Sequence, residues 1–268
     1  MKYTNRILLS DMDGTLLDSN SRVSSKNKEA IKFFVNNGGK FGIATGRSQL
    51  NSVNFLDEVP ISAPCILYNG GALYDFTANN FIALNLLPER VLINFLQYCI
   101  REVQNVMVQI YSTDMCYFVS KEALADPEVV AGHQPGQFIQ IEDIIHEPWI
   151  KILFSGSEKD LKLVEKMMFQ FDIADKVSRV FTSDIYLEIL PLGVSKGSML
   201  KNLKKTIGDD YKIYAVGDYN NDIEMIQLAD VGIATENALS CLKDMADHIS
   251  ASNDEDAIAD IIYRIMNE

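Results

Sequence analysis

Residues 6–15, RILLSDMDGT, constrain the fold more than any other stretch of the chain. The three consecutive aliphatic residues at 7–9 predict a strand buried on both faces, as in the centre of a parallel sheet. Asp11, Asp13 and Gly14 stand where this strand ends. Ligands of open α/β sheets bind at the carboxyl ends of the strands, so the two carboxylates are placed for chemistry. An ordinary strand-to-turn junction also uses Asp and Gly.

Two further apolar runs, KFGIATGR and CILYNGG, follow the first. Each is preceded by a segment whose apolar residues have helical spacing. Each also closes on a polar residue and a glycine, Thr45-Gly46 in one case and Asn69-Gly70 in the other. A β-α-β-α-β order of this kind predicts a Rossmann-like α/β fold, a doubly wound parallel sheet with helices on both faces.

The rhythm changes near residue 84, where strands begin to come in consecutive pairs with helices between the pairs. That order is typical of an α+β unit. The first rhythm then returns with a helix that Lys196 opens and with a strand, YKIYAVGD, that ends at Asp218. We therefore expect a discontinuous core domain and an inserted α+β domain, residues 1–83 with 188–268 and residues 84–187 respectively.

Charge and apolar patterning exclude several classes of partner. The formal charge of −13 would repel a nucleic acid or an anionic membrane. Charged residues interrupt every apolar stretch well below the length of a membrane span, and the amino terminus has no signal-peptide pattern. The four cysteines lack any C-x-x-C pairing, as in reduced cytoplasmic proteins. We expect a cytoplasmic protein, with a small phosphorylated ligand still allowed because a divalent cation would compensate its charge.

A parallel sheet of the predicted order brings the polar residues at its strand ends to one edge. In chain order they are Asp11, Asp13, Thr45, Asn69, Asp218, Asn221 and Asp222, with Lys196 at the start of a helix. Carboxylate oxygens are the ligands that Mg²⁺ prefers, whereas an ammonium group, a hydroxyl group and backbone N–H groups bind phosphoryl oxygens. The set fits phosphoryl transfer, in which positioning and charge neutralisation supply most of the catalysis.

Four motifs in this order, DMDGT, ATGR, the lysine of VSKG and GDYNND, resemble the haloacid dehalogenase superfamily, and closely its Cof-like sugar-phosphatase branch. The resemblance covers the whole chain, including the inserted domain, where that branch carries an α/β cap. It implies a Mg²⁺-dependent phosphatase that hydrolyses small phosphorylated metabolites, such as sugar phosphates, through an aspartyl-phosphate. One departure is Ala257, where the family often has glycine. This difference concerns loop shape or cap contacts rather than the chemistry.

The resemblance also implies a role for each motif residue. Asp11 would be the nucleophile, and Asp13 the acid that protonates the leaving oxygen and then activates water. Mg²⁺ would be bound by Asp11, the backbone carbonyl of Asp13 and Asp218, with Asp222 supporting these ligands. The phosphate oxygens would be held by the backbone N–H of Met12 and by Thr45, Gly46, Lys196 and Asn221.

Three alternatives stay open at this point. Residues 193–197 fit the G-x-S-x-G nucleophile elbow of an α/β-hydrolase, with Ser195 as nucleophile and His248 later in the chain. A phosphosugar mutase of the same fold would move phosphate without releasing it. A non-catalytic protein that binds a phosphometabolite would keep the site without turnover. The sequence specifies neither the substrate, nor the residues that read its leaving group, nor the oligomeric state.

Overall fold

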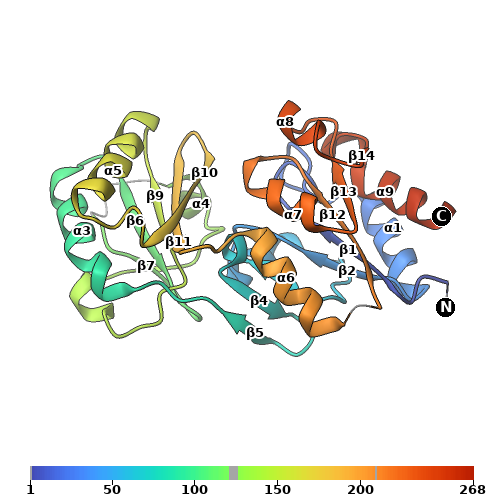
Figure 1. The fold of residues 1–268 in the computed structure, drawn as a ribbon, viewed down its shortest axis with the longest axis horizontal. Coiled ribbons are helices and arrows are strands. Elements are labelled where there is room, and N and C mark those ends of the chain that lie inside the picture. Colours follow the sequence, from blue (N-terminus) through green and yellow to red (C-terminus); the bar gives the residue numbers. More distant parts are fainter. Residues whose placement is uncertain (1, 121–125, 209) are drawn as a thin grey trace. The chain divides into compact units, whose positions relative to one another are not determined.

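The computed structural model describes residues 2–120, 126–208 and 210–268 of the chain. They form two compact units, Met1–Ala83 with Ser195–Glu268 and Leu84–Val194, so the second unit is inserted in the sequence of the first. Figure 1 labels most of their helices and strands. Below, the discontinuous unit is called unit 1 and the inserted one unit 2.

Unit 1 is built on a five-stranded parallel sheet. In spatial order its strands are β14 (His248–Ile249), β13 (Val231–Ala234), β12 (Lys212–Gly217), β1 (Arg6–Ser10) and β2 (Lys40–Ile43). Figure 1 shows β1, in blue, between β12 and β2. The predicted central strand is therefore central, and its last residue, Ser10, pairs with Val216 on one side and Ile43 on the other. The residues that directly follow β12, β1 and β2 therefore lie along the same edge of the sheet.

Helices of unit 1 bury the apolar side chains of this sheet. They are α1 (Ser25–Asn36), α2 (Gln49–Ser52), α6 (Lys196–Ile207), α7 (Ile223–Leu228), α8 (Ser240–Lys243) and α9 (Ala257–Asn267), with short 3-10 turns at Val53–Phe55, Tyr68–Gly70, Asn220–Asp222 and Asn253–Glu255. Met199, Leu200 and Leu203 of α6 share one buried cluster with Ile7 and Leu9 of β1. That packing fixes α6 against the strand that Asp11 follows.

A second small sheet completes unit 1. It consists of β3 (Cys65–Leu67), β4 (Ala72–Asp75) and β5 (Asn80–Leu84), with β3 and β4 antiparallel. A single parallel bridge between Ala44 and Ile66 joins it to the end of β2. Asn69, in the tight turn between β3 and β4, has a left-handed backbone with φ of 53°. This turn brings the polar residue at the end of β3 beside the loop that follows β2.

Unit 2 is an α+β unit with a six-stranded sheet. Its strands, in spatial order, are β10 (Val177–Ser183), β11 (Tyr186–Pro191), β9 (Lys151–Ser155), β6 (Met107–Tyr111), β7 (Cys116–Phe118) and β8 (Gln137–Phe138). All neighbours are antiparallel except β7 and β8. Its helices are α3 (Glu89–Glu102), α4 (Pro127–Val130) and α5 (Glu158–Gln170), with a 3-10 turn at Ile141–Ile144.

Alternation along the strands of unit 2 gives its sheet one apolar face. Phe95 of α3 and Val164 of α5 pack in one cluster with Ile110, Phe154 and Leu187 from three adjacent strands. This arrangement, together with the parallel sheet and helices of unit 1, is the fold class predicted from the sequence.

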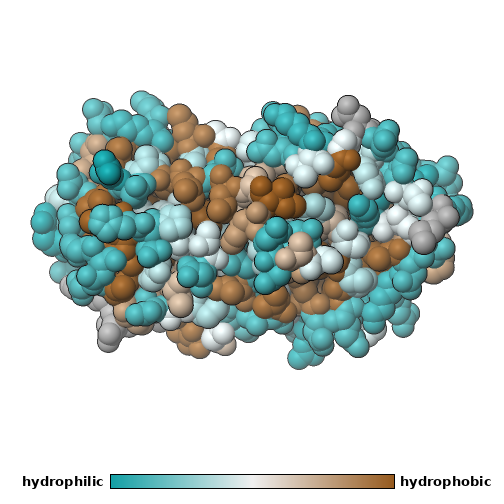
Figure 2. All heavy atoms as spheres, turned by 90° about the horizontal axis from the view of Figure 1, so that it is seen from below, coloured by the Kyte–Doolittle hydropathy of each residue, from teal (hydrophilic) through white to brown (hydrophobic). Residues whose placement is uncertain are grey.

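The surface is mixed in character. Figure 2 shows hydrophobic residues lying among hydrophilic ones on one face of the molecule. Large apolar side chains that are more than half exposed are scattered along the chain, at Val53, Val130, Phe169, Leu192 and Tyr263. Single exposed residues of this kind are normal on protein surfaces. Across the ranges that the structure describes, no helix combines the length and apolarity needed to cross a membrane.

Candidate active site

The loop after β1 places Asp11 at the edge of the sheet. Asp11 is only 6% exposed, and its backbone N–H donates to the carbonyl oxygen of Val216, at 2.9 Å. Gly14 turns the chain with φ of +79°, and a Cβ atom there would lie 2.5 Å from Oδ2 of Asp218. Both the backbone conformation and the lack of room therefore require glycine at position 14.

Lys196 brings a buried positive charge to Asp11. The side chain is fully buried, and its Nζ lies 2.6 Å from Oδ1 of Asp11 and 2.7 Å from Oδ1 of Asp222. The start of α6 is fixed by a capping box, in which the Ser195 hydroxyl accepts from the N–H of Ser198 and the Ser198 hydroxyl accepts from the N–H of Ser195. A buried charge is stable only when it is paired, so the lysine and the two carboxylates depend on one another.

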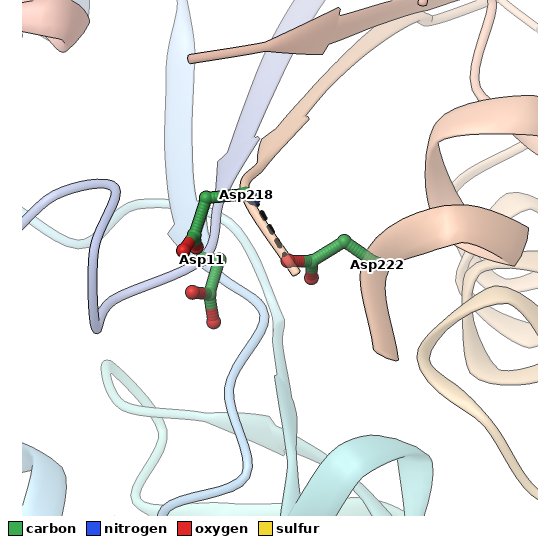
Figure 3. A group of neighbouring side chains, drawn as sticks. All are labelled: Asp11, Asp218 and Asp222. Atoms are coloured by element: carbon green, nitrogen blue, oxygen red, sulfur yellow. Dashed lines mark hydrogen bonds between the residues drawn. The ribbon is translucent and has the colours of Figure 1, made fainter. Parts of the chain in front are cut away.

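Asp222 connects this ion pair to Asp218. Its second carboxylate oxygen, Oδ2, accepts from the backbone N–H groups of Asp218 and Tyr219, at 3.1 and 3.2 Å; Figure 3 shows the first of these bonds. Asp218 in turn accepts a hydrogen bond at 2.9 Å from the hydroxyl of Thr15. The buried Asp222 carboxylate thus shapes the turn after β12 and holds Asp218 toward the loop after β1.

Three of the predicted acids form a group that suits a divalent cation. Asp11, Asp218 and Asp222 each offer a carboxylate oxygen, and these oxygens lie within 4.8 Å of one another. Figure 3 shows the three side chains reaching toward one another from the ends of β1 and β12 and from the start of α7. Hard oxygen donors are what Mg²⁺ prefers. Of the three carboxylates, those of Asp11 and Asp222 share the ammonium group of Lys196, which leaves an excess of negative charge, so the chemistry of the donor set fits a magnesium ion.

The pKa values of these groups reflect burial and crowding of negative charge. Burial raises the pKa of Asp11 well above its ordinary value, Lys196 lowers it in part, and Asp222 and Asp218 raise it again. Burial and then Asp222 raise the pKa of Asp218 to about 6. Burial alone would lower the pKa of Lys196, but the Asp11 and Asp222 carboxylates raise it above its ordinary value. The site therefore favours bound positive charge.

Asp13 has a different partner from the other acids. Its carboxylate is 55% exposed and accepts two hydrogen bonds from the guanidinium group of Arg47, from Nε to Oδ2 at 2.8 Å and from Nη2 to Oδ1 at 2.7 Å. The structure thus groups Asp11 with Lys196, Asp218 and Asp222, and pairs Asp13 with Arg47.

The predicted phosphate-binding residues line the neighbouring loops. Thr45 follows β2, and its backbone N–H donates to the carbonyl of Ile66, at 2.8 Å. A Cβ atom on Gly46 would lie 2.8 Å from Nδ2 of Asn69, and Oδ1 of Asn69 accepts from Nδ2 of Asn221 at 3.0 Å. Asn69 therefore joins the loops that carry Gly46 and Asn221.

Met12, the remaining predicted phosphate-binding residue, is buried in the turn after β1. Its carbonyl oxygen accepts from the N–H of Leu17, at 2.9 Å, which closes the turn. Two residues with site contacts, Thr15 and Arg47, were not among the predicted site residues. Both belong to motifs that carry the family resemblance, DMDGT and ATGR, and this membership could have identified them as site residues.

Ser195 has the contacts of a helix cap. Its hydroxyl accepts from the N–H of Ser198 and donates to the carboxylate of Glu224, while His248 lies in the edge strand β14. A nucleophile elbow instead needs its serine hydroxyl to donate to a histidine base. These contacts favour the capping role over the α/β-hydrolase alternative.

Comparison with known proteins agrees with this geometry. A family model described as haloacid dehalogenase-like hydrolase matches residues 8–262. The chain is 31% identical to the chloroplastic endoribonuclease YBEY of Arabidopsis thaliana, over 95% of this chain but only 45% of that protein, so it spans less than half of that relative. It is 29% identical to the 5-amino-6-(5-phospho-D-ribitylamino)uracil phosphatase YwtE of Bacillus subtilis (strain 168), over 96% of both chains.

A solved structure gives the same result for the fold. The crystal structure of a haloacid dehalogenase-like hydrolase from Bacteroides thetaiotaomicron superposes with a TM-score of 0.84 at 27% identity, covering 98% of this chain and 100% of that one. The predicted resemblance is confirmed by these matches. The chain belongs to the haloacid dehalogenase-like hydrolase family.

Proposed function

We propose that this protein is a Mg²⁺-dependent phosphatase that hydrolyses small phosphorylated metabolites, sugar phosphates among them, through an aspartyl-phosphate. The enzyme class, a phosphoric monoester hydrolase, follows from the family and from its phosphatase relatives. The observation that carries the proposal is the meeting of Asp11, Lys196, Asp218 and Asp222 in one buried group. Carboxylates crowded around one lysine are suited to a metal and a phosphoryl group together.

In the two steps of the reaction, Asp11 is assigned the covalent bond to phosphorus and Asp13 the proton transfers. An oxygen of Asp11 bonds to phosphorus while the bond from phosphorus to the leaving oxygen breaks, and Asp13 gives its proton to that oxygen. A water molecule then attacks phosphorus, Asp13 takes the proton of this water, and the bond from phosphorus to Asp11 breaks. Phosphate is released and Asp11 regains its carboxylate. Proton transfer by a positioned side chain of this kind contributes about 10²–10⁴-fold.

The other residues hold charge in place. Lys196 lies at hydrogen-bond distance from Asp11, so its ammonium group is positioned to neutralise both the nucleophile and the phosphoryl oxygens. The Thr45 hydroxyl, the Asn221 amide and the backbone N–H groups of Met12 and Gly46 are proposed to bind those oxygens as well. A rigid set of donors reduces the reorganisation needed during the reaction.

Mg²⁺ would be held by Asp11, the backbone carbonyl of Asp13 and Asp218. When bound, it would neutralise the charge that develops between the nucleophile and the phosphoryl group. Asp222 is proposed to act on the metal indirectly, because both of its oxygens are already used by Lys196 and by the backbone N–H groups of Asp218 and Tyr219.

Unit 2 is proposed to be a cap that contacts the leaving group and excludes bulk water during turnover. The partner is then a small phosphorylated metabolite rather than a nucleic acid or a membrane, and cytoplasm is the proposed location. The name of the Bacillus relative adds a phosphorylated ribitylaminouracil to the candidate substrates.

A phosphate-release assay tests the proposal. The panel contains sugar phosphates, the ribitylaminouracil phosphate and an aryl phosphate, each with Mg²⁺ and with EDTA. We expect release that depends on Mg²⁺ and that Asp11→Asn abolishes while the variant keeps the circular dichroism of the wild type. Phosphate that moves between positions of a sugar without release would indicate the mutase, and binding without turnover the non-catalytic protein. Absence of release from every compound would refute the phosphatase.

A further inference from the structure

Arg47 has no role in the reaction as described so far, although it donates two hydrogen bonds to the Asp13 carboxylate. Its Nε and Nη2 donate to the two different oxygens of the Asp13 carboxylate, at 2.8 and 2.7 Å. Two parallel bonds from a planar guanidinium group fix both the direction and the plane of a carboxylate. A lysine in the same place would supply charge without that orientation.

Arg47 is itself held by the segment that follows it. Its Nη1 donates to Oδ1 of Asn51 at 2.5 Å, and its guanidinium carbon lies 4.2 Å from the centroid of the Phe55 ring. The backbone N–H of Arg47 donates to the Thr45 hydroxyl, and its carbonyl accepts from the N–H of Tyr68. The two side-chain contacts anchor the guanidinium group, and the two backbone contacts hold the loop that carries it, all independently of Asp13.

The exposure of the two side chains shows which one depends on the other. The Arg47 side chain is 13% exposed, whereas that of Asp13 is 55% exposed. An exposed Asp side chain has several rotamers open to it. Asp13 therefore takes its orientation from the anchored Arg47.

The pairing also separates two carboxylates that are close in sequence. Lys196 holds the Asp11 carboxylate from the start of α6, and Arg47 holds the Asp13 carboxylate from the loop after β2. Each acid of the DMD sequence thus has its own cation, supplied by a different element. This division is what two acids with different tasks require.

We propose that Arg47 is a positioning residue that holds the Asp13 carboxylate where it reaches the leaving oxygen and the attacking water, an inference that rests on the proposed phosphatase function. Arg47 then acts only through proton transfer by Asp13. An alkyl phosphate needs that proton for its leaving oxygen, whereas a nitrophenyl phosphate leaves as a stable phenolate and needs it far less. Loss of Arg47 therefore affects the two substrates unequally.

The test compares kcat/KM of Arg47→Gln and Arg47→Lys on an alkyl phosphate and on p-nitrophenyl phosphate. In Arg47→Gln we expect the value for the alkyl phosphate to fall at least about tenfold more than that for the aryl phosphate. Arg47→Lys retains charge without the planar fork and should show the same bias with a smaller loss. Arg264→Gln is the control, because Arg264 pairs with Asp260 on the exposed side of α9, at 3.3 Å. This variant should keep the wild-type kcat/KM on both substrates.

Chemical rescue distinguishes positioning from a general structural role. Guanidinium chloride, well below denaturing concentration, should restore part of the alkyl phosphatase activity of Arg47→Ala. It should restore none in Arg47→Ala combined with Asp13→Asn. Asn51→Ala, which removes one anchor of the guanidinium group, gives a milder variant that should lose activity with the same substrate bias.

Two results would overturn the inference. Equal losses on both substrates would make Arg47 a phosphate-binding or structural residue, and unchanged kinetics in both variants would leave it without a part in the reaction. Either result leaves the wild type active. Failure of the phosphatase proposal itself would appear differently, as a wild-type enzyme that releases no phosphate from either substrate.

Discussion

Nζ of Lys196 lies 2.6 Å from Oδ1 of Asp11, although the two residues are 185 positions apart in the sequence. The contact joins the start of α6 to the end of β1, and both side chains are buried. Oδ1 of Asp222 lies 2.7 Å from the same ammonium group. Because removing one partner of a buried pair leaves an uncompensated charge, this lysine has a large effect on stability as well as on chemistry.

Lys196→Met should therefore destabilise the fold. We expect the free energy of unfolding, measured with urea, to fall by about 3 kcal/mol, and phosphatase activity to be lost. Lys204→Met is the matched control on the same helix, since Lys204 pairs with Asp230 at 2.8 Å and both side chains are about one-third exposed. That change should cost at most about 1 kcal/mol. Equal losses of unfolding free energy in the two variants would show that the buried ion pair stabilises the fold no more than the exposed one.

The stability of the metal-free protein should fall with rising pH. Burial and then Asp222 raise the pKa of Asp218 to about 6, whereas an unfolded chain has an Asp pKa of about 3.9. The folded state thus favours the protonated carboxyl, which adds to the free energy of unfolding. This stabilisation is fully present below the pKa of the unfolded chain and is lost as the pH rises through the pKa of the folded state. Urea unfolding in EDTA between pH 4 and 7 measures the loss.

Magnesium binding should have the opposite pH dependence. Because Mg²⁺ binds ionised carboxylates and displaces protons, the rise in melting temperature on adding Mg²⁺ should be larger at pH 7.5 than at pH 5. The rise is measured by thermal unfolding at both values of pH. A rise of the same size at both would argue against Asp218 as a metal ligand.

Thr15→Val should weaken Mg²⁺ binding, and so raise the Mg²⁺ requirement, without removing activity. The variant loses the 2.9 Å hydrogen bond that holds Asp218. Loss of such a supporting bond typically reduces metal affinity about tenfold or more. The Mg²⁺ concentration for half-maximal activity is the readout. Thr206→Val removes a hydroxyl that donates to Asn202 on the exposed side of α6 and should leave this concentration unchanged.

Gly14→Ala tests the close approach of the loop after β1 to Asp218. A Cβ atom would lie 2.5 Å from Oδ2 of Asp218, at φ of +79°. Gly132 has nearly the same backbone, φ of +76°, with no described atom within 4 Å of its Cβ position. Both changes should cost about 1 kcal/mol in backbone strain. Only Gly14→Ala should also raise the Mg²⁺ requirement, and similar behaviour of both variants would contradict the tight fit.

The elements that carry the site were predictable because their sequence patterns are strong. The apolar runs of β1, β2, β3 and β12 stand out as short buried strands. Helix α1 begins directly after Ser24, whose hydroxyl accepts from the N–H of Asn27 as a helix cap. Strand β14 has only two exposed residues and no pattern of its own. Helix α8 is only one turn long, and the chain leaves it to form β14.

The meeting of Asp11 and Asp218 was predictable from one rule, that parallel strand ends share an edge. Lys196 and Asp222 follow no strand directly, and their place in the site was implied by the motifs that contain them. The pairing of Asp13 with Arg47 was not predictable, because it depends on the rotamer of a half-exposed side chain and on anchors spread over the following turn. Their roles in the reaction remain predictions.

The departure at Ala257 has a local explanation. Ala257 is the first residue of α9, where alanine is favourable. The left-handed residue of this turn is Asp256, with φ of 64°. The special backbone conformation therefore lies one residue before the position at which the family often has glycine.

The position of the metal tests the central claim most directly. In a crystal grown with Mn²⁺, whose preference for carboxylate ligands resembles that of Mg²⁺, the anomalous difference map should contain one strong peak within coordination distance of both Asp11 and Asp218. The same preparation should release phosphate. A peak bound away from these two side chains, or full activity from crystals without metal between them, would contradict the account.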